Sequence, residues 1–204
     1  MGRLGRCSRL AGAATVGYLA GTVPSADLAT HVAASGVSDL RSEGSGNPGA
    51  ANAMAVLGTG WGLGVMAADI AKAALACRAG RAIAGDDGAH VAGTAAVIGH
   101  CYPVWNGFRG GKGVAASAGQ CLATFPAYFA VDVAVVGLAA ASPAWKRRAF
   151  AATAVSSACW VAAGVVWAKK GWSNAWGPEP TMALPLASAA TSVVILDKFR
   201  QASR

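Results

Sequence analysis

Charged side chains are scarce in this sequence. They make up 13 % of its 204 residues, against about 25 % in soluble globular domains, while hydrophobic residues make up 54 %. Long, weakly charged stretches recur along the whole length, which excludes a soluble domain with a single apolar anchor. The composition predicts one all-α domain, residues 1–204, that crosses a membrane several times.

Acidic residues are scarcer than basic ones. Nine Asp and Glu stand against 17 Lys and Arg, which gives a net charge of +8. The basic residues lie in short clusters between apolar runs, as in loops that face anionic lipid headgroups, so we expect a lipid bilayer and no nucleic acid as partner. The five cysteines show no close pairing and mostly lie inside apolar runs. This placement argues against a disulfide framework or a metal site, and we expect no cofactor.

Apolar runs divide the chain into about seven predicted transmembrane helices. The first run continues past Pro24, and a signal-peptide cut after Ala26 would place this proline close before the cut, so we expect a retained, continuous first helix. Residues 78–90 are polar and predict a loop between the second and third helices. The predicted helices cover about residues 10–34, 53–77, 91–105, 114–125, 127–141, 150–168 and 181–196.

Two pairs of ionisable residues lie inside these apolar runs. Asp69 and Lys72 are three residues apart, so they share a helix face and are expected to form an ion pair that offsets the desolvation of both. The pair could belong to a functional site, or it could be a structural ion pair that holds helices in register; the sequence supports both equally. Asp27 and His31 are four residues apart and also share a face, where we expect the first helix to enter the headgroup region.

The stretch Asn106–Gly113 contains four glycines with Arg109 and Lys112. Glycines allow positive φ, so several N–H groups can turn toward one anion beside the lysine charge, which describes a phosphate cradle. Gly113 stands where a nucleotide-binding loop has the Ser or Thr that holds magnesium, so nucleotide binding is not expected. A flexible basic turn is the alternative. His100, just before this stretch, is a candidate donor or base, or else a helix cap.

A second polar stretch, residues 39–52, combines hydroxyl and amide side chains with several glycines. Ser45, Asn47 and Asn52 are candidate ligands for a small polar substrate, although the same residue types are common in ordinary turns. Two predicted helices separate this stretch from Asn106–Gly113, so both lie on one side of the membrane. We therefore expect the two loops to converge on one anionic ligand.

These stretches resemble the motifs of the bacterial membrane acyl-phosphate:glycerol-3-phosphate acyltransferases. The first motif is matched by DLR at residues 39–41 and GSGNPGAAN at residues 44–52. The second is matched by GHCYPVW at residues 99–105 and GFRGGKGVA at residues 107–115. The DIAK sequence at residues 69–72 matches the polar spot in the family's second helix. The likeness is dense from about residue 17 to 122 and only architectural beyond.

The resemblance implies a seven-helix enzyme of the bacterial plasma membrane, with both loops in the cytoplasm. It would move an acyl group from acyl phosphate to the 1-hydroxyl of glycerol 3-phosphate, giving lysophosphatidate for phospholipid synthesis. Lys112 and the glycine amides would hold the donor phosphate, and the first loop the acceptor, while the acyl chain would lie in a groove open to lipid. The implied catalytic residues are Ser45, His100 and Lys112, and the implied substrate-binding residues are Arg41, Asn47, Gly49, Asn52, Arg109, Gly110, Gly111 and Gly113.

Some family positions carry other residues here. Ala55 stands where an arginine is usual, Ala51 where a threonine is usual, and residues 196–201 lack the expected His and Asn-Ile. Arg41 and Arg109 are available to supply the missing charge. Two alternatives therefore stay open at the level of sequence: a catalytically impaired relative that binds lipid precursors, and a transporter of an anionic solute.

Overall fold

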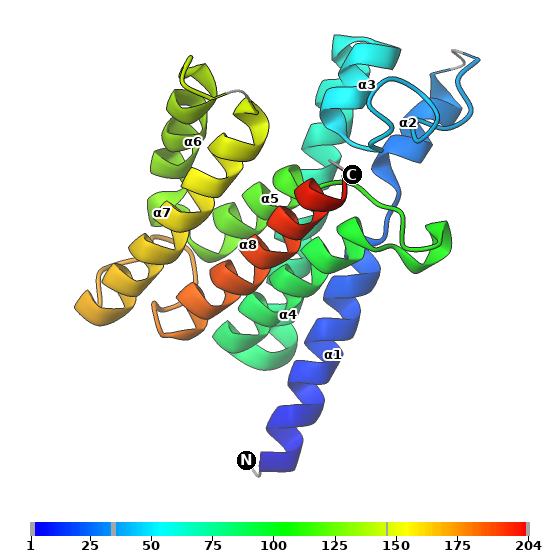
Figure 1. Ribbon diagram of the computed structural model, residues 1–204. Helices are drawn as coiled ribbons and strands as arrows, with labels where there is room; N and C mark the ends of the chain where they lie inside the picture. The colour runs from blue at the N-terminus through cyan, green and yellow to red at the C-terminus, as the bar shows by residue number, and fades with distance from the viewer. Residues whose placement is uncertain (1–2, 34–35, 146, 203–204) are drawn as a thin grey trace.

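The fold is all-helical, as predicted. A computed structural model describes residues 3–33, 36–145 and 147–202, and these residues contain α-helices, one 3₁₀ helix and no strand (Figure 1). The elements are α1 (Arg3–Gly21), α2 (Ser25–Val32), α3 (Ala50–Leu57), α4 (Thr59–Cys101), η1 (Val104–Asn106), α5 (Val114–Thr124), α6 (Pro126–Ala141), α7 (Arg148–Lys170) and α8 (Ala183–Gln201).

The first apolar run forms two helices, so the prediction of one continuous helix is wrong. α1 ends at Gly21 and α2 begins at Ser25. Pro24 lies between them, and its ring and missing N–H prevent an α-helix from passing through this position. The break turns α2 away from α1 and places it beside the first polar loop (Figure 1).

α4 consists of two arms joined by a tight turn. Ala84 and Gly85 have non-helical dihedral angles, with φ of 69° at Gly85. The arms touch at Gly80 and Gly88, where a Cβ on either glycine would collide with the carbonyl group of the other. The predicted loop over residues 78–90 is therefore wrong, because this segment stays helical apart from the turn. Its polar side chains lie on helix surfaces at the end of the bundle.

α4 is the centre of the bundle. α1, α3, α5 and α8 pack against it, and α7 joins α8 to α6. The contacts between α1 and α4 are close, since a Cβ at Gly17 or Gly21 would collide with the backbone of Ala92 or Ala96. Small residues at such positions let helices approach in a membrane, where association depends on packing. The core around α4 is accordingly built mainly from alanine with a few larger side chains.

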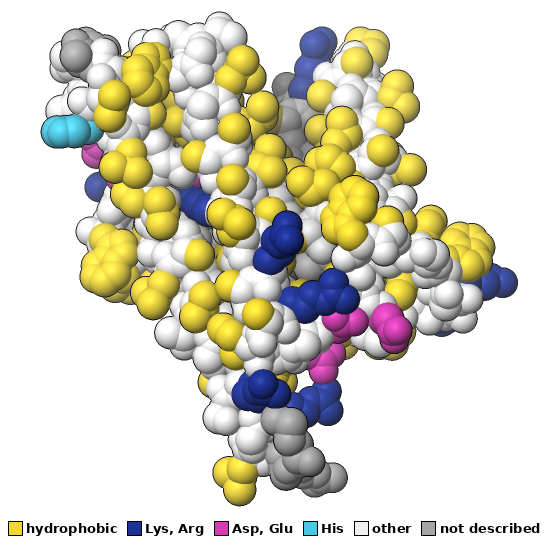
Figure 2. All heavy atoms as spheres, turned by 180° about the vertical axis from the view of Figure 1, so that it is seen from behind, with side chains coloured by type: hydrophobic (Ala, Val, Ile, Leu, Met, Phe, Trp, Pro, Cys, Tyr) yellow, Lys and Arg dark blue, Asp and Glu magenta, His cyan; other side chains and the backbone are white. Residues whose placement is uncertain are grey.

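The outer surface suits a membrane. Within the described residues, the segments Thr59–Asn106 and Arg148–Lys170 are long and apolar enough to cross one. Large apolar side chains such as Leu75, Leu138 and Val193 are more than half exposed on the outside of the bundle, as expected of surface that faces lipid. Figure 2 shows this hydrophobic surface above an end where basic and acidic side chains gather. That end carries the N-terminus and the turn of α4, opposite α2 and α3 (Figure 1).

Candidate functional site

The two polar loops meet, as the sequence predicted. The Arg41 Nε in the first loop donates a hydrogen bond to the Arg109 carbonyl oxygen in the second, at 2.9 Å. Between them lies a cavity of about 380 Å³. Its polar and charged lining comprises Arg41, Ser45, Asn47, Arg109, Lys112, Lys198 and Gln201. Four of these side chains are cationic and none is acidic, so the cavity is suited to phosphate groups.

Lys112 is positioned by the start of α5 and by α8. Gly113 has φ of 87° and caps α5, and a Cβ there would press on the Cys101 Sγ, so glycine is required on both grounds. The Lys112 Nζ lies 4.9 Å from the centre of the Phe199 ring. This cation–π contact holds the ammonium group beside the cavity.

The amides of two loop glycines do not face the cavity. The Gly110 N–H donates to the Cys101 carbonyl oxygen at 3.1 Å, and the Gly111 N–H donates to that of His100 at 3.2 Å. The prediction that these two amides cradle a phosphate is therefore wrong in this structure. Their role is close packing, because a Cβ at Gly110 would collide with the His100 carbonyl group and one at Gly111 with the His100 ring.

Asn52 shapes the first loop from within. Its Oδ1 accepts the Ser45 N–H at 2.8 Å, and its Nδ2 donates to the carbonyl oxygens of Leu40 and Glu43 at 3.0 and 2.9 Å. The side chain is buried, both of its N–H groups are used within the loop, and it is absent from the lining of the cavity. An amide with donor and acceptor can bridge a turn in this way. As a result, Ser45 is held at the cavity wall.

Gly49 does not line the cavity either. It is the N-cap of α3, and its N–H donates to the Asn47 carbonyl oxygen at 2.9 Å. A Cβ at Gly49 would press on the Asn47 amide. Gly49 therefore leaves room for the Asn47 side chain, which does reach the cavity lining.

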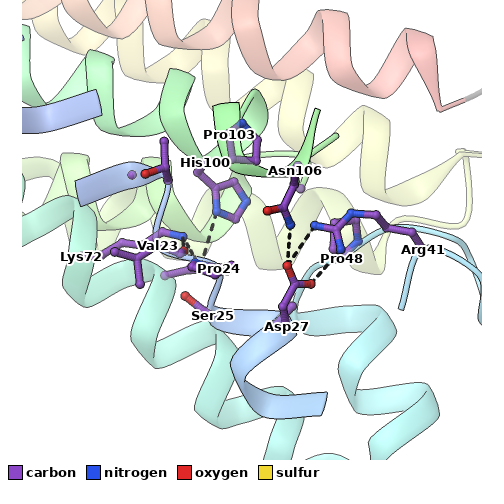
Figure 3. Close-up of a pocket in the computed structure, with 16 residues that line it drawn as sticks. Val23, Pro24, Ser25, Asp27, Arg41, Pro48, Lys72, His100, Pro103 and Asn106 are labelled. Atoms are coloured by element: carbon purple, nitrogen blue, oxygen red, sulfur yellow. Dashed lines mark hydrogen bonds and ion pairs between the residues drawn. The ribbon is translucent and has the colours of Figure 1, made fainter. Parts of the chain in front are cut away.

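A smaller pocket of about 20 Å³ adjoins the cavity and shares Arg41, Pro48 and Gly110 with it. Figure 3 shows Asp27 in this pocket between Arg41 and Asn106. The Asp27 Oδ1 lies 2.7 Å from the Arg41 Nη1, and its Oδ2 accepts a hydrogen bond from the Asn106 Nδ2 at 2.5 Å. Asp27 thus has partners from both polar loops, which the sequence did not predict. A carboxylate in an apolar run was the signal that pointed to a site.

Arg41 is compensated by two carboxylates. Besides Asp27, it contacts Asp39, whose Oδ1 lies 2.9 Å from the Arg41 Nη1. Burial alone would raise the pKa of Asp39, but hydrogen bonds from the backbone and side chain of Arg41 outweigh it and lower that pKa. Arg109 forms no ion pair within the described part of the chain and is exposed. Of the two arginines expected to supply the missing charge, only Arg41 is in direct contact with carboxylates in the described residues.

The predicted Asp69–Lys72 ion pair is confirmed. The Lys72 Nζ lies 2.9 Å from the Asp69 Oδ1 and donates to the Val23 carbonyl oxygen at 2.8 Å. The His100 Nδ1 lies 3.5 Å from the same carboxylate oxygen. All three side chains line the smaller pocket. His100 therefore lines the smaller pocket (Figure 3) and not the cavity that contains Ser45 and Lys112.

Two cavity residues on α8 were not predicted. Lys198 and Gln201 lie three residues apart, so they share a helix face. The Lys198 Nζ lies 4.4 Å from the centre of the Tyr102 ring, and the Gln201 Nε2 donates to the Tyr102 Oη at 3.2 Å. Ala55 lines neither pocket. The spacing of Lys198 and Gln201 indicates that they share a helix face. It does not indicate which loop this face contacts.

Comparisons with known proteins agree with this arrangement. The family model described as glycerol-3-phosphate acyltransferase matches residues 11–203. The chain is 38 % identical to a glycerol-3-phosphate acyltransferase of Hyphomonas neptunium over 160 residues, which are 78 % of this chain and 72 % of that protein. A protein of the same name from Cereibacter sphaeroides is 39 % identical over 153 residues, covering 74 % of this chain and 68 % of that protein.

Solved structures show the same likeness. The crystal structure of PlsY (YgiH), an integral membrane glycerol 3-phosphate acyltransferase, in its glycerol 3-phosphate form is 27 % identical and superposes with a TM-score of 0.74. The lysophosphatidic acid form is 26 % identical with a TM-score of 0.73. Both comparisons cover 94 % of this chain and 88 % of the PlsY chain. This chain is therefore a membrane protein and belongs to the glycerol-3-phosphate acyltransferase family.

Proposed function

We propose that this protein is an integral membrane enzyme that acylates the 1-hydroxyl of glycerol 3-phosphate from an acyl phosphate donor. The observation that carries the proposal is the cavity between the two loops, where Arg109, Lys112 and Lys198 surround a space bordered by Ser45 and Asn47. Donor and acceptor each bring a phosphate group, and a site for both must offset several negative charges. Cations from the second loop and from α8 supply this compensation.

The reaction needs little chemistry from the protein. The oxygen of the acceptor hydroxyl attacks the acyl carbon, the bond from that carbon to the phosphate oxygen breaks, and phosphate leaves with the electron pair. The lining of the cavity contains no carboxylate or imidazole, so the proton of the acceptor hydroxyl passes to the departing phosphate. Lys112 offsets the charge that gathers on the leaving phosphate, and Ser45 and Asn47 orient the acceptor.

The acyl chain has a place beside this cavity. A pocket of about 150 Å³ lies between α5, α6, α7 and α8. Val114, two residues after Lys112, lines one end of this pocket, and Ile195, three residues before Lys198, also lines it. Phe129 adds an aromatic ring to a wall that is mostly apolar, and the Asp132 carboxylate in this wall accepts a hydrogen bond from Ser156. A donor with its phosphate at Lys112 would thus direct its chain into apolar surface between helices.

We propose that the enzyme lies in the bacterial plasma membrane, with both loops toward the cytoplasm. Both expected substrates carry phosphate charges and are made inside the cell, and the product is a lipid precursor. The cavity lies at the loop end of the bundle, where glycerol 3-phosphate can enter from water. The pocket beside it lies between helices, where the acyl chain of the donor can enter from lipid.

The test is acyl transfer by the purified protein in detergent. With palmitoyl phosphate and labelled glycerol 3-phosphate, we expect lysophosphatidate and an equal amount of inorganic phosphate. Product with palmitoyl-CoA alone would contradict the proposed donor. No product with either donor would leave only a binding role, and flux of glycerol 3-phosphate into sealed vesicles would identify a transporter.

A further inference from the structure

A second cavity lies at the opposite end of the bundle from the two loops. Its volume is about 630 Å³, and it lies between the two arms of α4, the end of α5 and the connection from α7 to α8. Its lining consists of Ala74, Cys77, Arg78, Arg81, Ala82, Ala89, Leu122, Ala123 and Trp176. None of these residues takes part in the cavity or pocket described above.

Two arginines stand on one face of α4 in this cavity. Arg81 is partly used by the protein, because its Nε lies 2.8 Å from the Asp86 Oδ1 and its Nη1 donates to the Trp176 carbonyl oxygen at 3.2 Å. Arg78 is exposed and has no ion pair or hydrogen bond within residues 3–33, 36–145 and 147–202. Its guanidinium, with all of its N–H donors, is therefore available to a ligand at the cavity wall.

Two of the nearby acidic groups, Asp86 and Asp87, are already paired with arginines. Asp86 faces Arg81 and also accepts the Glu179 N–H at 2.9 Å. Asp87, the next residue, pairs with Arg6 on α1 at 2.5 Å. The charge of Arg78 therefore remains uncompensated by these carboxylates, and the cavity is attractive to an anion.

The rest of the wall is apolar and made of small side chains. Ala74, Cys77 and Ala89 from α4 face Leu122 and Ala123 from α5, which leaves a groove between the two helices. In a membrane a groove of this kind is in contact with lipid chains. The arginines lie within two helical turns of the α4 break at residues 84 and 85, at the charged end of the molecule seen in Figure 2.

Trp176 marks the depth of the cavity. Its side chain lines the cavity and is 68 % exposed. Tryptophan is enriched where the hydrocarbon of a bilayer meets the headgroups, since its ring is apolar and its N–H polar. The cavity thus has a cation and an indole at headgroup depth and an apolar groove leading toward the hydrocarbon.

We infer that this cavity binds one anionic phospholipid from the leaflet opposite the two loops. The lipid phosphate bridges the guanidinium of Arg78 and the remaining N–H groups of Arg81, and one acyl chain fills the groove beside Leu122. Arginine suits this role because its planar fork of donors matches two phosphate oxygens. A free phosphate ion would use the arginine alone and leave the apolar groove unfilled, so the lipid is the occupant that matches the whole cavity.

The test measures lipid binding to delipidated, detergent-purified protein by native mass spectrometry. We expect phosphatidylglycerol to bind more tightly than phosphatidylcholine with the same chains. Arg78→Gln should weaken phosphatidylglycerol binding about 10- to 150-fold, the usual effect of losing a charge-assisted contact, while Arg78→Lys should weaken it less. Ala123→Phe should reduce binding of both lipids, because the ring fills the groove.

Matched controls separate the site from general charge and hydrophobicity. Lys169→Gln removes a cation from the end of α7, and Ala134→Phe adds a ring on the exposed side of α6, both outside the cavity. Neither should change lipid binding. Equal binding of the two lipids to the unaltered protein, or equal effects of Arg78→Gln and Lys169→Gln, would overturn the inference. The inference would also be overturned if inorganic phosphate displaced the lipid at the same concentration at which the lipid itself saturates the site.

Discussion

Asp27 and Arg41 form a two-point ion pair, with the Oδ1–Nη1 and Oδ2–Nη2 distances at 2.7 and 3.3 Å. The pair connects α2 to the first polar loop. Because Arg41 also donates to the Arg109 carbonyl oxygen, and Asp27 also accepts from Asn106, one carboxylate and one guanidinium tie α2 to both loops. The geometry of the cavity between the loops therefore depends on Asp27, a residue outside the recognisable motifs.

Asp27→Asn should destabilise the protein through Arg41. The substitution leaves the guanidinium beside a neutral amide, and the two groups are largely shielded from water, with exposed side-chain fractions of 31 % and 13 %. A double-mutant cycle with Arg41→Gln should give a coupling free energy of about 0.5–3 kcal/mol, measured by chemical unfolding in detergent. Glu43→Gln, an exposed acid in the same loop, is the control. A coupling near zero would show that the contact does not hold the loops.

Asp69→Asn should destabilise the protein more than the double change Asp69→Asn with Lys72→Gln. The Asp69 side chain is 3 % exposed, and removing one member of a buried pair leaves the other charge unpaired, which costs about 3–5 kcal/mol. The double change removes both charges and should recover part of this loss. Thermal unfolding of Asp69→Asn, Lys72→Gln and the double variant in detergent measures the effect. Simple addition of the two single effects would contradict the pairing.

Lys112→Ala should lower kcat and raise the KM for acyl phosphate together. The ammonium group lies at the cavity and offsets phosphate charge both in the bound donor and in the transition state. The loss of one charge-assisted contact reduces kcat/KM by roughly 10- to 150-fold. Arg148→Ala removes a cation from the start of α7, outside the cavity, and should leave both constants unchanged. A similar loss in both variants would point to a general charge effect.

Asp39 should contribute to the acid sensitivity of the loop. Its pKa in the folded protein lies below the ordinary value of 3.8, so its stabilising contribution is present above pH 3.8 and is lost as the pH falls through the lower, folded pKa. Asp39→Asn should therefore be less stable than the unaltered protein at neutral pH. The difference should shrink below about pH 4. Unfolding measured from pH 7 to 2 checks this, and a constant difference over that range would contradict it.

Features that depend on local sequence spacing or on the number of helices could be predicted from the sequence. The Asp69–Lys72 pair followed from a spacing of three on one helix, and the meeting of the two loops followed from the even number of predicted helices between them. Helix breaks were harder to locate. The polarity of residues 78–90 indicated a long loop. Instead, the chain turns at only two residues, Ala84 and Gly85, and the two arms of α4 pack closely where Gly80 meets Gly88.

Contacts between distant segments could not be predicted. Asp27 meets Arg41 only because Pro24 turns α2 back toward the loop, and Lys198 reaches the cavity only because α8 packs beside α4. A single sequence shows which residues share a face but not which faces meet. Asn52 is a second example. An amide in a glycine-rich loop is a plausible substrate ligand by sequence, but the three hydrogen bonds of Asn52 are all made to that loop.

Ala55→Arg should improve the use of glycerol 3-phosphate. Ala55 is exposed on α3, three residues after Asn52, so it lies on the helix face from which Asn52 contacts the first loop. A guanidinium at this position would project along that loop toward Ser45 and add a charge-assisted contact to the acceptor phosphate. The KM for glycerol 3-phosphate should fall by roughly 10-fold or more, with that for acyl phosphate unchanged. Ala55→Gln, of similar length without the charge, should bring no such gain. An equal fall in both variants would attribute the effect to side-chain length, and a fall in neither would show that the cavity already compensates the acceptor phosphate through Arg109 and Lys198.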